Sequence, residues 1–161
     1  MNKLVEWFCL NYPDLKKSMQ CCEHAEVDIN PYHIEGDCWS HTMMVCKVAE
    51  LKDFSKVIQV ASLLHDIGKP NSRKVNPNNS HVLFFGHEEE SAKMAKPILD
   101  KLAKDKYIKS SDKEYILNLI LYHGLVYKES IEELSKRFNK EFLKHLMQLN
   151  ECDRLGRFHK I

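Results

Sequence analysis

Apolar residues recur at helical spacing through most of the chain. They lie three or four residues apart in segments 2–10, 38–51, 55–66, 87–102, 112–123, 130–138 and 140–153, the period of one face of an α-helix. Asp37, Ser130 and Asn139 stand where N-cap residues are expected, and Pro13 begins a further short helix. The pattern predicts an all-α fold of about six to eight helices.

Two polar stretches interrupt this period. Residues 22–36, which contain Asn30-Pro31 and Gly36, and residues 68–80, rich in Asn, Pro and Lys, are predicted to be loops. The short apolar run at residues 82–86 suits an extended segment, and Pro97 is predicted to kink or divide the helix around it. The sequence contains no repeat or linker, so residues 1–161 are expected to form a single compact helical domain.

The most apolar helix leads into two residues with metal-ligand side chains. Nearly every position from Val57 to Leu64 is apolar, which is typical of a helix in the middle of a bundle, and His65 and Asp66 follow. Gly68 is predicted to end the helix with a positive φ, and Pro70 to prevent its continuation. A buried imidazole and carboxylate are costly unless paired or bound to metal, and together they suit Mg, Mn, Fe, Co, Ni or Zn.

Composition narrows the class of partner. Lys and Arg number 24 against 23 Asp and Glu, a net charge of +1, so no global basic field favours a long nucleic acid. A small anionic substrate needs only local positive charge. The six cysteines form no CxxC pair and no secretion signal precedes them, so reduced thiols in a cytoplasmic protein are expected. No apolar run approaches the roughly 20 residues that span a bilayer, which argues against a membrane protein.

Two further candidate ligands, His41 and Asp153, lie on other helices. In this order the residues resemble the HD superfamily of metal-dependent phosphohydrolases, with a His on one helix, a His-Asp pair ending a later helix and an Asp on a final helix. The resemblance covers about residues 33–157 and includes no nucleotidyltransferase domain. It is most similar to the HD domain of bacterial CCA-adding enzymes in the strings HIEGDCWSHTMMV (33–45), HDIGKP (65–70), GHEEESA (86–92) and DRLGR (153–157).

The resemblance implies an HD-type helical fold and one set of metal ligands: His41, His65, Asp66 and Asp153. Two imidazoles and two carboxylates suit one octahedral divalent ion with open positions for water and a phosphate oxygen. Such an ion lowers the pKa of water and neutralises charge on the phosphoryl group. Asp66 is the ligand we expect to share a proton with the attacking water.

His87 and His123 form a second tier of candidates. In related phosphohydrolases, histidines at such places bind a second metal or touch the substrate phosphate, which would give both residues catalytic roles. The alternative is that His87 begins a helix and His123 ends one, where an imidazolium suits the negative end of the helix dipole.

Candidate substrate contacts surround these ligands, and Lys69 among them is also a candidate catalytic residue: Glu35, Asp37, Lys69, Arg73, Arg154 and Arg157. Lys69 and Arg73 follow the His-Asp pair, where cations can hold phosphate oxygens, and their alternative role is solvated surface charge. The resemblance suggests that Glu35 and Asp37 line the substrate end of a cleft, although Asp37 also suits an N-cap. Arg154 and Arg157 follow the last ligand and either pair with acidic residues or reach a phosphate.

The leading hypothesis is a divalent-metal-dependent phosphodiesterase or phosphatase. Its substrate would be a small phosphorylated molecule, either a nucleotide or a 2′,3′-cyclic or terminal phosphate of RNA. A 5′-nucleotidase or deoxynucleotide phosphohydrolase is the enzymatic alternative. A non-catalytic HD module that binds a nucleotide or a protein is the alternative from another class. Four other histidines, His24, His81, His145 and His159, are predicted to have no role in the site. His33 fits either reading, since it matches the motif but lies in a predicted loop.

Overall fold

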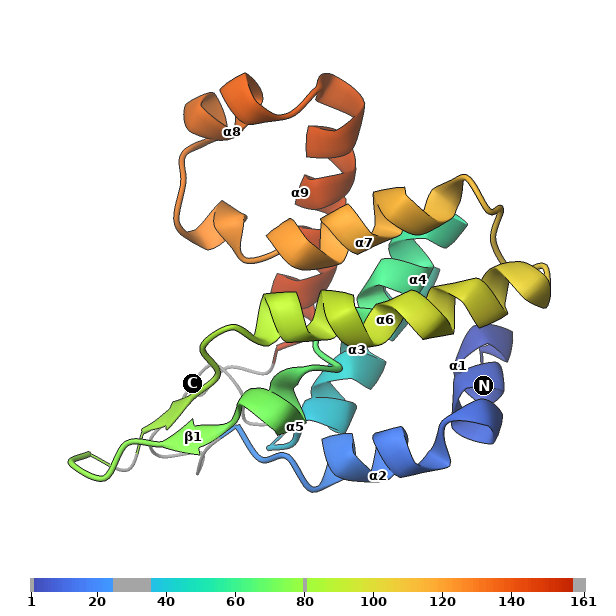
Figure 1. Cartoon of the computed structure of the whole chain (residues 1–161). Helices are drawn as coiled ribbons and strands as arrows, with labels where there is room; N and C mark the ends of the chain where they lie inside the picture. The colour runs from blue at the N-terminus through green and yellow to red at the C-terminus, as the bar shows by residue number, and fades with distance from the viewer. Residues whose placement is uncertain (1, 25–35, 80, 158–161) are drawn as a thin grey trace.

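The computed structural model describes residues 2–24, 36–79 and 81–157, which form a mainly helical structure with one small two-stranded sheet (Figure 1). The longer helices are α1 (Lys3–Asn11), α2 (Pro13–Gln20), α3 (Cys38–Leu51), α4 (Lys56–Leu64), α6 (His87–Lys104), α7 (Asp112–Tyr122), α8 (Ile131–Arg137) and α9 (Lys140–Leu155). The single-turn α5 (Lys69–Ser72) and the 3-10 helix η1 (Leu125–Tyr127) complete the helical elements described. The all-α prediction is confirmed, and the eight longer helices agree with the expected number.

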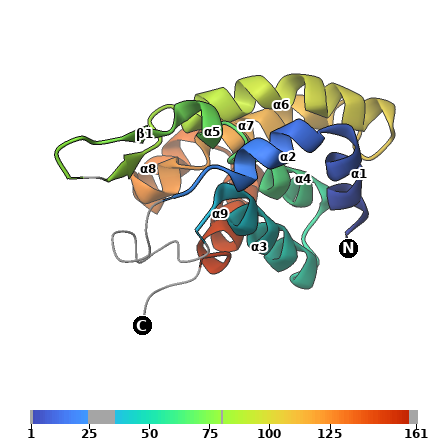
Figure 2. The ribbon, with the colours of Figure 1, turned by 90° about the horizontal axis from the view of Figure 1, so that it is seen from below.

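Helix α4 occupies the middle of the bundle. Ile58, Val60, Ala61, Leu63 and Leu64 are fully buried, and α4 packs against α3, α7 and α9. Helices α6 and α7 lie side by side, and seen from below α3 runs beside α9 (Figure 2). The C-terminal end of α4 is therefore surrounded by helices from both halves of the chain.

Three predicted helix starts are confirmed by their caps. The Asp37 carboxylate accepts a hydrogen bond from Ser40 N at 2.8 Å, the Ser130 hydroxyl from Glu133 N at 3.1 Å, and Asn139 Oδ1 from Phe142 N at 2.8 Å. Each cap satisfies one amide that the first helical turn leaves without a partner. Local chemistry thus fixes where α3, α8 and α9 begin.

The prediction of a loop at residues 68–80 is partly wrong. This stretch contains α5 and the strand β1 (Lys74–Val75), which pairs antiparallel with β2 (Val82–Leu83), Lys74 opposite Leu83. The extended segment expected at residues 82–86 is confirmed for its first two residues. Pro70 lies in the first turn of α5, where its missing amide hydrogen removes no helical bond.

Gly68 does not take the positive φ that the sequence suggested. Its φ is −83°, within the right-handed helical region, so backbone freedom is not the reason for glycine here. A Cβ at this position would lie 2.4 Å from Ser91 N in the first turns of α6. Gly68 N also donates a hydrogen bond to Ser91 Oγ at 2.8 Å. Glycine is needed because α6 begins directly against the turn that follows the His-Asp pair.

Pro97 does not divide its helix, because α6 runs without interruption from His87 to Lys104. Pro97 and Lys93, four residues earlier, are both exposed, so water can satisfy the Lys93 carbonyl that loses its helical donor. The loop predicted at residues 22–36 lies mostly outside the described residues, as does Glu35. Among the residues described, none of the six cysteines forms a disulfide, and no helix is long and apolar enough to cross a membrane.

Candidate metal centre

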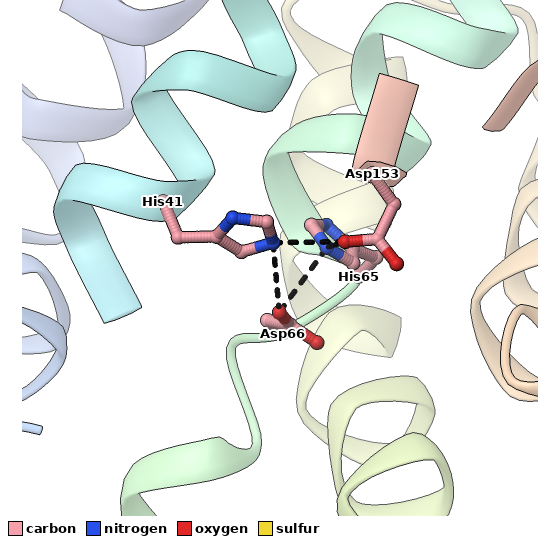
Figure 3. A group of neighbouring side chains, drawn as sticks. All are labelled: His41, His65, Asp66 and Asp153. Carbon is pink, nitrogen blue, oxygen red and sulfur yellow. Dashed lines mark hydrogen bonds and ion pairs between the residues drawn. The ribbon is translucent and has the colours of Figure 1, made fainter. Parts of the chain in front are cut away.

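Four side chains meet at the end of α4 (Figure 3). His41 comes from α3, His65 and Asp66 follow α4, and Asp153 comes from α9; one ligand atom of each lies within 4.8 Å of the others. His41 Nε2 is 2.8 Å from Asp153 Oδ1 and 3.7 Å from Asp66 Oδ2. His65 Nε2 is 3.2 Å from Asp66 Oδ2. We refer to His41, His65, Asp66 and Asp153 as the inner group.

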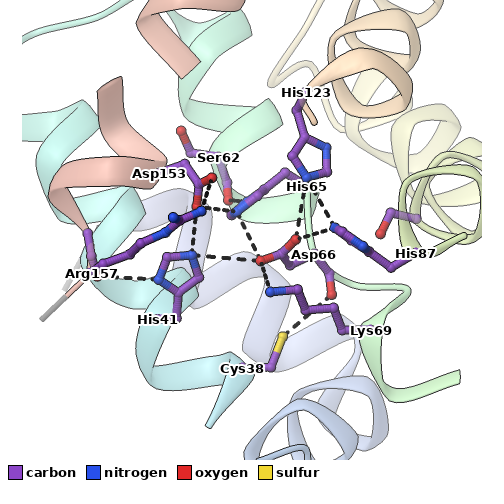
Figure 4. A network of polar contacts seen from close by, with 12 residues as sticks. Cys38, His41, Ser62, His65, Asp66, Lys69, His87, His123, Asp153 and Arg157 are labelled. Carbon is purple, nitrogen blue, oxygen red and sulfur yellow. Dashed lines mark hydrogen bonds and ion pairs between the residues drawn. The ribbon is translucent and has the colours of Figure 1, made fainter. Parts of the chain in front are cut away.

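Asp66 also belongs to a second group with His87 and His123 (Figure 4). Its other oxygen, Oδ1, lies 3.2 Å from His87 Nε2 and 3.5 Å from His123 Nε2. His87 is the first residue of α6 and His123 follows the last residue of α7. We refer to Asp66, His87 and His123 as the outer group. One carboxylate therefore joins the two groups, with one oxygen directed to each.

All four histidines of the two groups are oriented in the same way. The ring Nδ1 donates to a backbone carbonyl, at 3.3 Å from His41 to Gly156 O, 2.7 Å from His65 to Ser62 O, 3.0 Å from His87 to Phe84 O and 2.6 Å from His123 to Ile120 O. In a neutral ring Nε2 is then the unprotonated nitrogen. Metal-binding histidines are commonly held in this way, with the second ring nitrogen bonded to a carbonyl or carboxylate.

A local rule explains three of these orientations. His65, His87 and His123 each bond to the carbonyl three residues earlier in the chain. For His65 that carbonyl belongs to the last turn of α4, where carbonyls lack an amide donor. For His123 it is the Ile120 carbonyl in the last turn of α7, which also accepts the backbone N–H of His123 at 3.4 Å. The helix-ending role and the ligand role of His123 are therefore compatible, because the ring uses a different nitrogen for each.

The donor set fits a divalent cation. His87 Nε2 and His123 Nε2 are 3.3 Å apart, and two unprotonated nitrogens facing one another require a shared proton or cation between them. His65 Nε2 is buried and faces two carboxylate oxygens, Asp66 Oδ2 at 3.2 Å and Asp153 Oδ1 at 3.5 Å. Imidazole nitrogens and carboxylate oxygens are donors that Mn, Fe, Co, Ni and Zn accept. The chain thus contains a buried His/Asp cluster that can hold a divalent metal, whose identity the side chains do not specify.

The electrostatics of the inner group favour ionised carboxylates. Burial by itself raises the pKa of Asp66, but His65 and Lys69 outweigh it and hold that pKa well below its usual range. Burial likewise opposes ionisation of Asp153, and hydrogen bonds from His41 and His65 lower its pKa well below the usual range. Burial lowers the pKa of His65, but Asp66 and Asp153 outweigh it and raise the pKa to about 10. Without metal, a proton on His65 takes the place of a cation.

A cavity of about 170 Å³ opens onto the two groups. Its walls include Asp66, Asp153, His87 and His123, together with three cationic side chains: Lys69, Lys128 and Arg157. Lys69 is buried, with its Nζ 3.1 Å from Asp66 Oδ2 and 3.2 Å from His24 Nε2. A phosphate in this cavity would meet positive charge on several sides.

Sequence analysis missed Tyr127, Lys128 and His24 as residues of this site. The Tyr127 hydroxyl donates to Asp153 Oδ2 at 2.9 Å, and Arg157 Nη2 contacts both atoms at 3.0 Å. Burial and the neighbouring Asp153 raise the pKa of Tyr127, so the hydroxyl keeps its proton and remains a donor. Tyr127 lies in the short η1, where no apolar period exists to signal its position.

Several predicted substrate contacts do not line the cavity among the described residues. Arg73 Nε donates to Glu23 O at 2.8 Å, Arg154 is exposed on α9, and the Asp37 carboxylate binds Ser40 as an N-cap. Glu35 lies outside the described residues. Of the candidate substrate contacts, Lys69 and Arg157 are therefore the two that the structure places in the cavity.

An all-α bundle that directs histidines and aspartates from separate helices into one buried cluster is the arrangement of the HD class of metal-dependent phosphohydrolases. The family described as HD domain matches residues 38–157. The chain belongs to the HD domain family.

The chain is similar to several curated proteins that carry the description Multifunctional CCA protein. That of Dechloromonas aromatica (strain RCB) is 25% identical over 136 residues, 78% of this chain and 31% of the relative. That of Methylobacillus flagellatus is 31% identical over 99 residues, 60% of this chain and 22% of the relative. That of Burkholderia cenocepacia (strain HI2424) is 34% identical over 71 residues, 44% of this chain and 16% of the relative. The chain thus spans less than a third of their lengths, and no solved structure matches it.

Proposed function

We propose that the chain is a divalent-metal-dependent phosphohydrolase that acts on nucleotides or on 2′,3′-cyclic or terminal phosphates of RNA. The observation that carries the proposal is the cavity in which Asp66 and Asp153 meet three cationic side chains, Lys69, Lys128 and Arg157. A metal site alone serves many chemistries, whereas a metal site beside several cations suits a phosphate ester. The relatives, described as Multifunctional CCA proteins, favour an RNA or nucleotide substrate.

The metal ligands and two of the cations would have different roles in hydrolysis. A divalent ion in the inner group would supply a Lewis acid and lower the pKa of the attacking water. Asp66 would take a proton from that water, because it reaches the inner group through one oxygen and the cavity side through the other. Lys69 and Arg157 would hold phosphate oxygens. Arg157 Nε is buried and has no acceptor among the described residues, so it retains a donor for an anion.

His87 and His123 would act at the other side of the phosphate. Their Nε2 atoms face Asp66 Oδ1 and could hold a second ion or contact the leaving oxygen. Either role places positive charge where the leaving group develops negative charge, which is the effect that lowers the barrier for phosphate ester cleavage.

The direct test is turnover by protein stripped of metal and reloaded with Mn, Ni, Co or Mg. Its substrates are 2′,3′-cyclic nucleotides, nucleoside monophosphates, deoxynucleotides and a simple phosphoester. We expect metal-dependent phosphate ester hydrolysis, strongest on cyclic or terminal phosphates, and its loss in His41→Gln. Preference for 5′-monophosphates or deoxynucleotides would favour the 5′-nucleotidase or deoxynucleotide phosphohydrolase alternative. Tight metal binding with no product from any substrate would replace the proposal with a binding module.

Lys69→Ala separates phosphate binding from metal binding. We expect a higher KM with the metal content nearly unchanged, because Lys69 contacts Asp66 but is not itself a metal donor. Lys101→Ala, in the last turn of α6, is the matched control and should leave both quantities unchanged. Loss of metal in Lys69→Ala would contradict the assigned role.

A further inference from the structure

A second cavity joins the one at the metal centre. It has a volume of about 380 Å³, compared with about 170 Å³ for the first, and the two share Glu88, Gly124 and Lys128 in their walls. Binding sites for whole small molecules generally occupy roughly 300–1,000 Å³. The first cavity alone therefore suits a phosphate group but not a complete nucleotide, and the rest of the substrate needs the second.

The walls of this second cavity combine apolar and aromatic surface with carboxylates and one cation, Lys128. Leu121, Tyr122 and Leu125, from the end of α7 and from η1, supply apolar and aromatic surface. Glu88 and Glu89, from the first turn of α6, supply carboxylates. Aromatic and aliphatic surface favours a flat ring system, and carboxylates accept hydrogen bonds but cannot donate them.

The aromatic wall is held in position from its other side. The Tyr122 ring packs against the Phe138 ring, with centroids 5.2 Å apart, and the Arg137 guanidinium lies 6.0 Å from the Tyr122 centroid. Tyr122 is thus positioned by α8 and the residue that follows it. A ring fixed in this way can stack on a ligand with little loss of side-chain freedom.

The carboxylates also limit what can enter. The two carboxylates of Glu88 and Glu89 outnumber the single cation, Lys128, so a second or third phosphate group is disfavoured in this cavity. A neutral base is accepted, and a base with adjacent N–H donors is favoured over one that presents acceptors. Guanine has two such donors, at N1 and the exocyclic amine, which match the two oxygens of one carboxylate.

We propose that the cavity lined by Glu88, Glu89, Leu121, Tyr122 and Leu125 binds the nucleobase of the substrate, with a preference for guanine. This inference rests on the proposed function, since it places the reacting phosphate in the adjoining metal cavity. Stacking on Tyr122 supplies affinity for any base, and the carboxylates of α6 select the base by its donors.

The first experiment compares substrates that share one reacting group. Guanosine, adenosine, cytidine and uridine 2′,3′-cyclic phosphates are measured against glycerol 1,2-cyclic phosphate, which has the same cyclic diester and no base. We expect kcat/KM to be roughly 5- to 150-fold higher with a base than without, the range for one base–aromatic stack, with guanosine first. Equal kcat/KM for all five compounds would overturn the base site and leave the hydrolase standing. If none of the five compounds is hydrolysed, the proposed hydrolase function is contradicted.

Two variants assign the effect to this cavity. Glu89→Gln, on the exposed first turn of α6, should reduce the guanosine-to-uridine ratio of kcat/KM about tenfold. Glu114→Gln, in the first turn of α7 at the far end from Tyr122, is the matched control and should keep the ratio. Tyr122→Leu should lower the ratio of each base-bearing substrate to glycerol 1,2-cyclic phosphate. The proposal is contradicted if Glu89→Gln keeps the guanosine-to-uridine ratio and Tyr122→Leu keeps the ratio of base-bearing substrates to glycerol 1,2-cyclic phosphate.

A binding measurement avoids any dependence on turnover. Methyl-labelled, metal-free protein titrated with guanosine 3′-monophosphate should show chemical-shift changes at Leu121 and Leu125, and none at Leu15 on α2. Uridine 3′-monophosphate should require a higher concentration for the same shifts. If the metal-free protein shows these shifts but the metal-loaded protein hydrolyses none of the substrates, the base site stands and the hydrolase function is contradicted. If the metal-loaded protein hydrolyses them but the shifts are absent, the hydrolase function stands and the base site is contradicted.

Discussion

The inner and outer groups share Asp66 but differ in how they meet solvent. His41 and His65 are fully buried, and the inner group reaches the cavity only through its two aspartates among the described residues. His87 and His123 line the cavity themselves, and the His87 side chain keeps 15% of its surface exposed. Buried ligands favour tight holding of an ion, whereas ligands in a cavity wall can also contact substrate.

The two groups also differ in what supports them. The inner residues are attached to α3, α4 and α9, which pack together around the middle of the bundle. The outer histidines stand at the start of α6 and the end of α7. These two helices pack most extensively against one another, and of the two only α7 also packs closely against α4 and α9. We infer that the inner group binds the ion and the outer group adapts to the substrate.

Substitution of the shared carboxylate should have the largest effect. In Asp66→Asn both groups lose their common anion, so we expect bound metal to fall close to zero and kcat/KM to drop roughly 1000-fold or more. Elemental analysis and turnover measure the two losses, and circular dichroism checks that the helices remain. Asp100→Asn, an exposed carboxylate on α6, is the control. Undiminished turnover in Asp66→Asn would remove this residue from the mechanism.

His87→Gln should separate the groups. We expect kcat/KM to fall roughly 100-fold while the inner ion stays bound, because Asp66 Oδ2 keeps both inner imidazoles as neighbours. His41→Gln, measured in parallel, should lose the ion as well. If the two variants lose metal equally, the division into inner and outer groups is wrong.

In the metal-free protein, His65 of the inner group should make the free energy of unfolding depend on pH. The folded pKa of His65 is about 10, above the ordinary value of about 6.5, so its stabilising contribution is complete below pH 6.5 and is lost as pH rises toward 10. The free energy of unfolding should fall across this range with a slope of up to about 1.4 kcal/mol per pH unit.

Urea unfolding with and without a chelator measures that slope. In the metal-loaded protein the ion has already displaced the His65 proton, so this contribution to the slope should disappear. His145→Gln, which alters a histidine on the α9 face that bonds to Tyr115, should leave the slope as it is. A metal-free protein of constant stability from pH 6.5 to 10 would contradict the protonated inner group.

Tyr127→Phe should have the smallest effect of the four changes. It removes one hydrogen bond to Asp153, while Arg157 still contacts the same oxygen at 3.0 Å. We expect kcat/KM to fall about tenfold or less, with metal content unchanged. Tyr115→Phe, which removes a hydroxyl away from the cavity, is the matched control. Loss of metal would show that Tyr127 is essential to the position of Asp153.

The helices and the inner group could be predicted because their signals are local or follow a known order along the chain. Apolar period, N-caps and the His-Asp pair after α4 are all visible in the sequence. The separate roles of Lys69 and Arg73 were not visible. Four residues apart, they would share a helical face, but α5 ends at Ser72 and Arg73 is extended, with ψ at 125°. Tertiary geometry, and not residue type, separates the cation in the cavity from the one outside it.

Gly68 is a second position where tertiary packing could not be predicted from the sequence. A glycine after a helix is usually explained by its backbone freedom, and that explanation failed here because the constraint is the approach of α6. Tyr127 and Lys128 were missed because a 3-10 turn has no repeating pattern to analyse.

The attachment of each imidazole to a backbone carbonyl has a consequence for the choice among cations. A ring held at Nδ1 cannot retreat to make room for a larger ion without breaking a hydrogen bond within the bundle. Sites built from such stiff nitrogen donors discriminate by ionic radius, and calcium, which needs longer bonds to six or more oxygens, is poorly accommodated. We therefore expect the site to bind small transition-metal ions more tightly than calcium, because hydrogen bonds to the backbone hold its imidazoles in place.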